Sequence, residues 1–151
     1  SPQSAFQIIQ GLETVSLRME KHCANAAKVA EYLSNHNKVS RVIYAGLDEG
    51  EAGDRANKYL KGGHGALCGF ELKGGKSSGE KFIDNLNMFY HVANIGDARS
   101  LAIHPATTTH SQLSDEDMEA AGVNPSYVRL SIGIEHIDDI LNDLKNALDA
   151  A

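Results

Sequence analysis

The sequence predicts an α+β fold, with a mostly antiparallel four-stranded sheet that carries helices on one face. One observation is the order of hydrophobic patterns, which reads helix, strand, strand, helix, strand, strand, helix. Another is size: 151 residues, 42% hydrophobic and 23% charged, suit one soluble core. No internal repeat or linker divides the chain. We therefore expect residues 1–151 to form a single domain whose second sheet face is open.

Apolar residues at helical spacing predict a long helix near each end of the chain. The first pattern runs from Pro2 to Leu33, and Asn35 or Asn37 can end it. Gly11 lies inside this pattern and costs about 1 kcal/mol relative to alanine, which a long apolar stripe can absorb. The second pattern runs from Ile137 to Leu148. Both segments are therefore expected to be amphipathic helices.

Alternating apolar residues predict the strands. Gly69 lies on the polar face of the second strand, where a missing side chain allows close backbone approach. Pro105 ends the third strand. The four predicted strands are Val39 to Tyr44, Gly65 to Lys73, Arg99 to Ile103 and Tyr127 to Gly133.

Shorter helices are expected in the connections. At most two turns are predicted around Arg55 to Leu60, and a longer helix is predicted from Gly79 to Phe89. A local helix follows Ser114, whose side chain can cap it with Asp117 three residues on, and Gly122 can close it.

Composition excludes several classes of function. The net charge of −6 repels nucleic-acid phosphates, and no apolar run reaches the ~18–20 residues of a membrane helix. With only Cys23 and Cys68, a disulfide framework is not expected, which favours the reducing cytoplasm. Both cysteines lie in apolar patterns and are interpreted as core residues. The histidines show no metal-ligand spacing and no GxSxG motif is present, so neither a metal site nor a serine nucleophile is predicted.

Arg129 is the most informative residue of the sequence. In the strand from Tyr127 to Gly133, Val128 and Leu130 face the predicted core, so Arg129 points to the uncovered face. A guanidinium fixed there can bind a carboxylate through two parallel hydrogen bonds, which a lysine cannot reproduce. The alternative is a solvated or salt-bridged arginine on an open sheet surface.

A polar, irregular stretch from Asn94 to His110 is the second candidate region. It contains Gly96, Asp97, Arg99, Ser100 and Pro105, and three successive threonines precede His110. Loops of this composition often carry binding residues, although they can also be structural turns.

Ordered motifs at these segments, and at others throughout the chain, carry a family resemblance. They are SPQSAF at 1–6, QGLET at 10–14, RME at 18–20, ANIGDARSL at 93–101, IHPATTTHSQL at 103–113 and VRLSIGIEHIDD at 128–139. Together they resemble the C-terminal domain of the Cys/Met-metabolism family of pyridoxal-phosphate enzymes. The resemblance covers essentially the whole chain and implies the small α+β domain of a fold-type I enzyme.

The resemblance implies roles for three residues. Arg129 would bind the α-carboxylate of an amino-acid substrate, while Ser100 and Leu101 would line the substrate side near the cofactor. The segments around Gly96 to Arg99 and Ile103 to Pro105 resemble the sulfhydrylase branch more than the cystathionine synthase and lyase branches. In that branch the cofactor acts as an electron sink while sulfide replaces acetate on the γ-carbon of O-acetylhomoserine, giving homocysteine.

One family feature is missing from the sequence. The family anchors pyridoxal phosphate through a lysine in a Ser-x-Thr-Lys context, and no lysine here has that setting. We therefore expect a substrate-side domain, without bound cofactor and inactive alone, whose open face meets an absent large domain. The start at Ser1-Pro2 without an initiator methionine suggests an excised piece. The resemblance also implies a homotetramer for the full-length enzyme.

Several alternatives stay open at this point. The parent could be a cystathionine γ-synthase or a lyase of the same family. The chain could also be a binding or dimerisation module that carries out no chemistry. The sequence does not decide whether Tyr59, Tyr90 or His110 contacts substrate.

Overall fold

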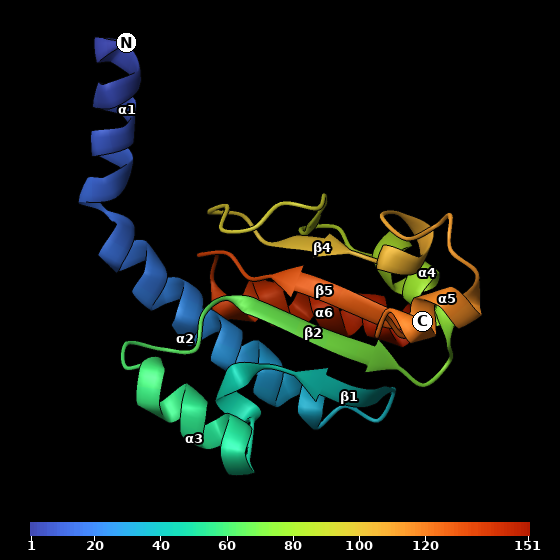
Figure 1. The fold of residues 1–151 in the computed structure, drawn as a ribbon. Coiled ribbons are helices and arrows are strands. Elements are labelled where there is room, and N and C mark those ends of the chain that lie inside the picture. The colour runs from blue at the N-terminus through green and yellow to red at the C-terminus, as the bar shows by residue number, and fades with distance from the viewer.

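A computed structural model describes all residues from 1 to 151 and confirms the α+β class (Figure 1). The helices are α1 (Pro2–Glu13), α2 (Val15–Ser34), α3 (Gly50–Tyr59), α4 (Lys76–Asp84), α5 (Asp115–Ala120) and α6 (Ile137–Ala150). The strands are β1 (Val39–Ile43), β2 (Leu67–Leu72), β3 (Tyr90–His91), β4 (Leu101–Ile103) and β5 (Tyr127–Ser131). None of the helices combines the length and the apolar character that crossing a bilayer requires.

The five strands form one sheet in the order β1-β2-β5-β4-β3. The pairs β1/β2, β2/β5 and β4/β5 are antiparallel, and β3 pairs with β4 in parallel. The sequence predicted four of these strands and missed β3, because a strand of two residues is too short to show an alternating pattern. β5 lies at the centre of the sheet, as the sequence predicted for the strand that carries Arg129.

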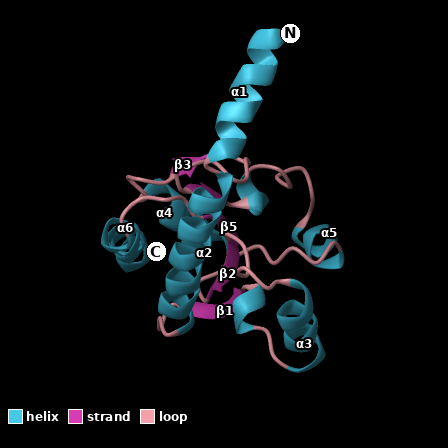
Figure 2. Ribbon diagram, turned by 90° about the vertical axis from the view of Figure 1, so that its left-hand side faces the viewer, coloured by secondary structure: helices cyan, strands magenta, loops and turns pink.

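The core lies between one face of the sheet and the helices α2, α4 and α6 (Figure 2). Phe70 of β2 meets Phe82 of α4 edge to face, with ring centroids 5.2 Å apart. Val128 and Leu130 of β5 are fully buried beneath these helices. α3 and α5 lie on the other side of the strands, at the margins of the sheet (Figures 1 and 2).

The predicted N-terminal helix is two helices. α1 ends at Glu13, and α2 begins at Val15 after an interruption at Thr14. The guanidinium of Arg18 spans the interruption by donating to the Gly11 carbonyl and to Thr14 Oγ1. α1 buries no residue and projects from the body of the domain (Figure 1).

Two other helix boundaries differ from the expectation. α4 ends at Asp84, not at Phe89. The Asp143 carboxylate accepts the backbone N–H groups of Asn87, Met88 and Phe89, so this segment forms its hydrogen bonds outside a helix. α3 has 10 residues, more than the predicted one or two turns.

The helix predicted after Ser114 forms as expected. Ser114 Oγ accepts the N–H of Asp117, and Gly122 follows the helix with a φ of +76°. Glycine adopts this left-handed conformation without strain.

Candidate functional site

Arg129 lies at the middle of the central strand and faces away from the helical layer. Its neighbours in register are Gly69 on β2 and Ile103 on β4. Val128 and Leu130, on either side of it, point into the core. The alternation predicted from the sequence is therefore confirmed, and the guanidinium belongs to the open face of the sheet.

A hollow of about 390 Å³ lies beside Arg129 on this face. Its walls come from β1, β2, β5 and the segments next to β1 and β2. The lining residues are Ile43, Tyr44, Ala45, Asp48, His64, Leu67, Cys68, Gly69, Tyr127 and Arg129.

The glycine of β2 shapes this hollow. A Cβ atom on Gly69 would lie 2.4 Å from the Tyr127 hydroxyl and 2.5 Å from its Cε2 atom. The ring of Tyr127 can lie across β2 only because that atom is absent, so the space at Gly69 admits a side chain where the sequence predicted an approach of backbone. Burial raises the pKa of the Tyr127 hydroxyl, and the positive charge of Arg129 opposes this shift only in part. The hydroxyl is therefore protonated at neutral pH and can donate a hydrogen bond.

The guanidinium of Arg129 has unused donors. Nη2 donates to the Asn94 carbonyl at 3.4 Å, whereas Nε is shielded from solvent and has no partner. None of the ion pairs in the chain involves Arg129. An unpaired, partly desolvated guanidinium favours an anionic ligand, and a carboxylate matches its planar geometry.

Ser100 is buried and its side chain is fully engaged within the chain. Its Oγ donates to Glu135 Oε2 at 3.0 Å and accepts the Gly133 N–H at 2.9 Å. Its own N–H donates to Glu135 Oε1 at 2.6 Å. The Ser100 carbonyl accepts the Tyr90 N–H at 3.0 Å. The hydroxyl, the N–H and the carbonyl of Ser100 therefore all have partners within the chain, and Ser100 holds the loop in place.

Leu101 lies on the same sheet face as Arg129. It pairs with Ser131 across β4 and β5, and its neighbour Ala102 points into the core. Its side chain is only 3% exposed. The predicted position near the candidate site is consistent with this placement, although Leu101 does not line the hollow.

The polar stretch from Asn94 to Arg99 crosses the end of β5 as an exposed loop. Gly96 N–H donates to Ser131 Oγ at 3.1 Å, and Ile134 N–H donates to the Ala98 carbonyl at 2.9 Å. This loop supplies the only carbonyl that accepts a hydrogen bond from the Arg129 side chain. It is therefore part of the candidate site and more than a connection.

The three residues that the sequence left undecided lie outside the hollow. Tyr59, on α3, is 71% exposed. Tyr90 stacks with the Arg99 guanidinium, which lies 4.8 Å from the ring centroid. His110 Nδ1 bonds with Thr109 Oγ1 at 2.9 Å.

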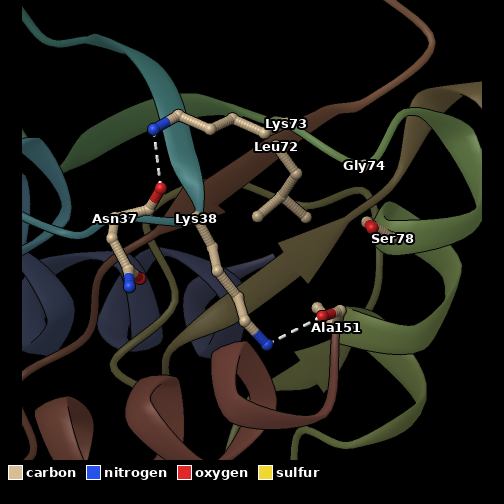
Figure 3. A pocket seen from close by; sticks show the side chains of 7 residues that line it. All are labelled: Asn37, Lys38, Leu72, Lys73, Gly74, Ser78 and Ala151. Carbon is tan, nitrogen blue, oxygen red and sulfur yellow. Dashed lines mark hydrogen bonds between the residues drawn. The ribbon is translucent and has the colours of Figure 1, made fainter.

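A second cavity, of about 210 Å³, lies at the far end of β2 (Figure 3). Two lysines line it, but backbone carbonyls hold both. Lys38 Nζ donates to the carbonyls of Leu148 and Ala151, and Lys73 Nζ donates to that of Asn37. The Lys38 contacts fasten the end of α6 to the segment before β1, and the Lys73 contact fastens the end of β2 to the same segment, so both lysines have a structural role.

The cysteines and histidines form no second reactive centre. Cys68 is buried in the core as predicted, and burial raises the pKa of its thiol to about 12, so it is protonated at neutral pH. Cys23 is only half-buried and lies outside the core, so the core interpretation is wrong for that residue. No three His, Cys, Asp or Glu side chains lie close enough together to hold a metal ion.

Sequence reasoning missed Asp48, His64 and Glu135. The first two reach the hollow from irregular segments. Glu135 meets a partner 35 positions away, so no local spacing indicates the contact.

Comparison with known proteins places the chain in a family. The sequence model of a protein family, the Cys/Met metabolism PLP-dependent enzymes, matches residues 1–149. The chain belongs to this family. The sequence resemblance is thereby confirmed.

The relatives of this Cys/Met-metabolism chain include enzymes with two activities. An O-acetyl-L-homoserine sulfhydrylase of Leptospira meyeri is 55% identical over 98% of the chain and 34% of its own length. An L-methionine gamma-lyase of Fusobacterium nucleatum subsp. polymorphum is 43% identical over 98% of the chain and 37% of its own length. The chain thus spans about a third of these relatives.

A solved structure shares the fold. It is a protein from Campylobacter jejuni named O-acetylhomoserine (thiol)-lyase, solved with N'-pyridoxyl-lysine-5'-monophosphate. It is 42% identical, with a TM-score of 0.88 over 99% of the chain and 35% of that protein. The small α+β domain predicted from the sequence is therefore a recurring part of a PLP enzyme.

The residues of this chain do not form a complete binding site for pyridoxal phosphate. No lysine lines the hollow beside Arg129, and none has the family's anchoring context. Within the Cys/Met-metabolism family, this chain lacks a lysine in the context that anchors the cofactor.

Proposed function

We propose that this chain is the substrate-side domain of an O-acetylhomoserine sulfhydrylase. The full-length enzyme would convert O-acetyl-L-homoserine and sulfide to L-homocysteine and acetate. Relatives of that name, 55% identical in Leptospira meyeri and 48% identical in Thermus thermophilus, support the assignment. The observation that carries it is the Arg129 guanidinium, which has a buried, unpaired Nε and no acid of its own chain.

In this proposal Arg129 binds the α-carboxylate of the substrate. Two parallel hydrogen bonds would fix the carboxylate and thereby orient the remaining atoms of the amino acid. The Tyr127 hydroxyl, protonated at neutral pH, can add a donor at the same face. Ile43 and Leu67 expose apolar surface around the hollow, which the missing large domain would cover.

The chain alone should be inactive, because it lacks the anchoring lysine. A direct test is to incubate the 151-residue chain with pyridoxal phosphate and O-acetyl-L-homoserine. We expect neither covalent attachment of the cofactor by mass spectrometry nor release of homocysteine in the presence of sulfide. Turnover by the isolated chain would contradict this part of the proposal.

The carboxylate role predicts the effect of Arg129→Lys in the full-length enzyme. The KM for O-acetyl-L-homoserine should rise about tenfold or more, since losing a hydrogen bond to a charged group costs about 1.5–3 kcal/mol. Steady-state kinetics measure this at saturating sulfide. Arg55→Lys is the matched control, because Arg55 is exposed and pairs only with Glu51 on α3. An unchanged KM in Arg129→Lys would rule out the carboxylate contact.

The methionine gamma-lyase relatives make a lyase or synthase of the same family the second candidate. Competing thiols separate the activities. A sulfhydrylase should use sulfide in preference to cysteine, a γ-synthase should form cystathionine from cysteine, and a lyase should release a keto acid without added thiol. A module without chemistry would show none of these products. The tetrameric assembly and the cytoplasmic location stay predictions.

A further inference from the structure

The carboxylate of Glu135 is held by one residue of the candidate site. Glu135 is half-buried, lies four residues after the end of β5, and takes part in no ion pair. Both of its oxygens accept from Ser100, at 2.6 Å from the backbone N–H and 3.0 Å from Oγ. A carboxylate that receives two donors from a single residue fixes that residue in both position and orientation.

The backbone around this contact is packed too tightly to move independently. A Cβ on Gly133 would lie 2.2 Å from Glu135 Oε2 and 2.5 Å from both Ala98 O and Ser100 N. Ser100 Oγ also accepts the Gly133 N–H. Glu135, Ser100 and Gly133 therefore form a closed hydrogen-bonded unit, which we call the Glu135 clamp.

The clamp is anchored to the helical layer. Asn25 of α2 donates through Nδ2 to the carbonyls of Gly133 and Glu135, at 3.0 and 2.9 Å. Because α2 packs on the buried face of the sheet, the clamp connects that rigid layer to the exposed loop.

The loop in turn contacts Arg129. Residues 94–99 lead directly into Ser100, and the Asn94 carbonyl accepts the only hydrogen bond that the Arg129 side chain donates. Any displacement of the loop therefore removes the one acceptor that orients the guanidinium within this chain. A continuous series of contacts therefore connects Glu135, through Ser100 and the loop, to Arg129.

We propose that Glu135 is a positioning residue for substrate binding, which orients Arg129 through Ser100 and the 94–99 loop. This inference rests on the proposed carboxylate role of Arg129. Glu135 itself does not line the hollow, so it acts through its neighbours and not on the ligand.

The test uses Glu135→Gln in the full-length enzyme loaded with its cofactor. An amide offers only one acceptor oxygen, so one of the two Ser100 donors loses its partner. We expect the KM for O-acetyl-L-homoserine to rise about five- to tenfold, with a smaller change in kcat and none in the KM for sulfide. Glu119→Gln on α5 is the control, because Glu119 is exposed and takes part in no ion pair.

A pair of inhibitors separates positioning from general loosening. L-norleucine carries the α-carboxylate, and L-norleucinol replaces it with a hydroxymethyl group. Glu135→Gln should weaken inhibition by norleucine and leave inhibition by norleucinol unchanged. If both inhibitors weaken equally, or neither does, Glu135 does not act through Arg129 and the inference is wrong.

Two further variants keep the test decisive. Glu135→Asp, which keeps the charge but shortens the reach, should give the same selective loss if Glu135→Gln fails to yield soluble holoenzyme. Arg129→Lys is measured in parallel. If Arg129→Lys no longer distinguishes norleucine from norleucinol but the Glu135 variants still do, only the positioning role of Glu135 is wrong. If Arg129→Lys still distinguishes norleucine from norleucinol as the unchanged enzyme does, the proposed carboxylate role of Arg129 is wrong, and the positioning role of Glu135 is wrong with it.

Discussion

At the scale of single residues, buried polar side chains hold the irregular segments to the regular elements. Asp143 of α6 accepts three backbone N–H groups from the segment before β3. His22 Nδ1 lies 2.6 Å from the carbonyl of Ile132 at the end of β5. His104 bonds to the Pro125 carbonyl through Nε2 at 2.8 Å and to Thr107 through Nδ1. Each contact joins positions that are far apart in sequence or irregular in conformation.

His104 predicts a pH dependence of stability. Burial lowers the pKa of its imidazole, although the hydrogen bond to Pro125 opposes that shift. The unfolded chain, with a pKa of about 6.5, takes up a proton before the folded chain does. The stability that comes from keeping His104 neutral is therefore present above about pH 6.5. It is lost as the pH falls toward the lower pKa of His104 in the folded chain.

Urea denaturation followed by circular dichroism between pH 7.5 and 5 measures this effect. His104→Gln keeps a donor for the Pro125 carbonyl but cannot titrate, so its stability should fall less on acidification. His110→Gln is the control, because the His110 side chain bonds only with Thr109, and it should behave like the unchanged chain. Equal pH slopes in the unchanged chain and in His104→Gln would contradict the prediction.

At the scale of elements, the crossing of Tyr127 over Gly69 couples β5 to β2 on the open face. The predicted effect of Gly69→Ala is a loss of about 1–3 kcal/mol, because the new methyl group overlaps the Tyr127 ring. In a Tyr127→Ala background the same change should cost much less, since the overlapping atoms are gone. A double-mutant cycle by chemical denaturation measures this coupling. Strictly additive effects would show that the ring does not cause the loss.

Pattern reasoning recovers those elements whose determinants are local. Ser114 and Gly122 identify a helix because a cap and a left-handed glycine act within a few residues. The alternation around Arg129 identifies the open face for the same reason. The end of α4 escapes prediction, because it depends on Asp143, which lies more than 50 positions away. β3 escapes it because pairing with β4, and not its own pattern, makes it a strand.

The candidate site divides in the same way. Arg129, on a regular strand, is predictable as a residue that faces away from the core. The Glu135 clamp is not, because the contact between Glu135 and Ser100 exists only once β5 and the 94–99 loop lie side by side. The resemblance to a family names Ser100 but does not indicate that its hydroxyl is occupied by Glu135 and Gly133.

At the scale of the whole molecule, one-sided packing leaves two surfaces without a partner. One is the open sheet face around Arg129. The other is α1, where Ile8 and Leu12, one turn apart, are 63% and 60% exposed. Contiguous apolar surface of this kind is rare on monomeric proteins and promotes association.

The exposed stripe of α1 predicts that the isolated 151-residue chain self-associates. Hydrophobic burial between copies would offset the cost of exposing these side chains to water. Sedimentation velocity should show larger species as the concentration rises, and replacing Ile8 and Leu12 together by Gln should shift the chain toward the monomer. Glutamine retains helix propensity, so the change tests apolar surface and not helix formation. Gln10→Ala, on a different side of α1, should leave the distribution unchanged, and a monomeric unmodified chain at high concentration would contradict the prediction.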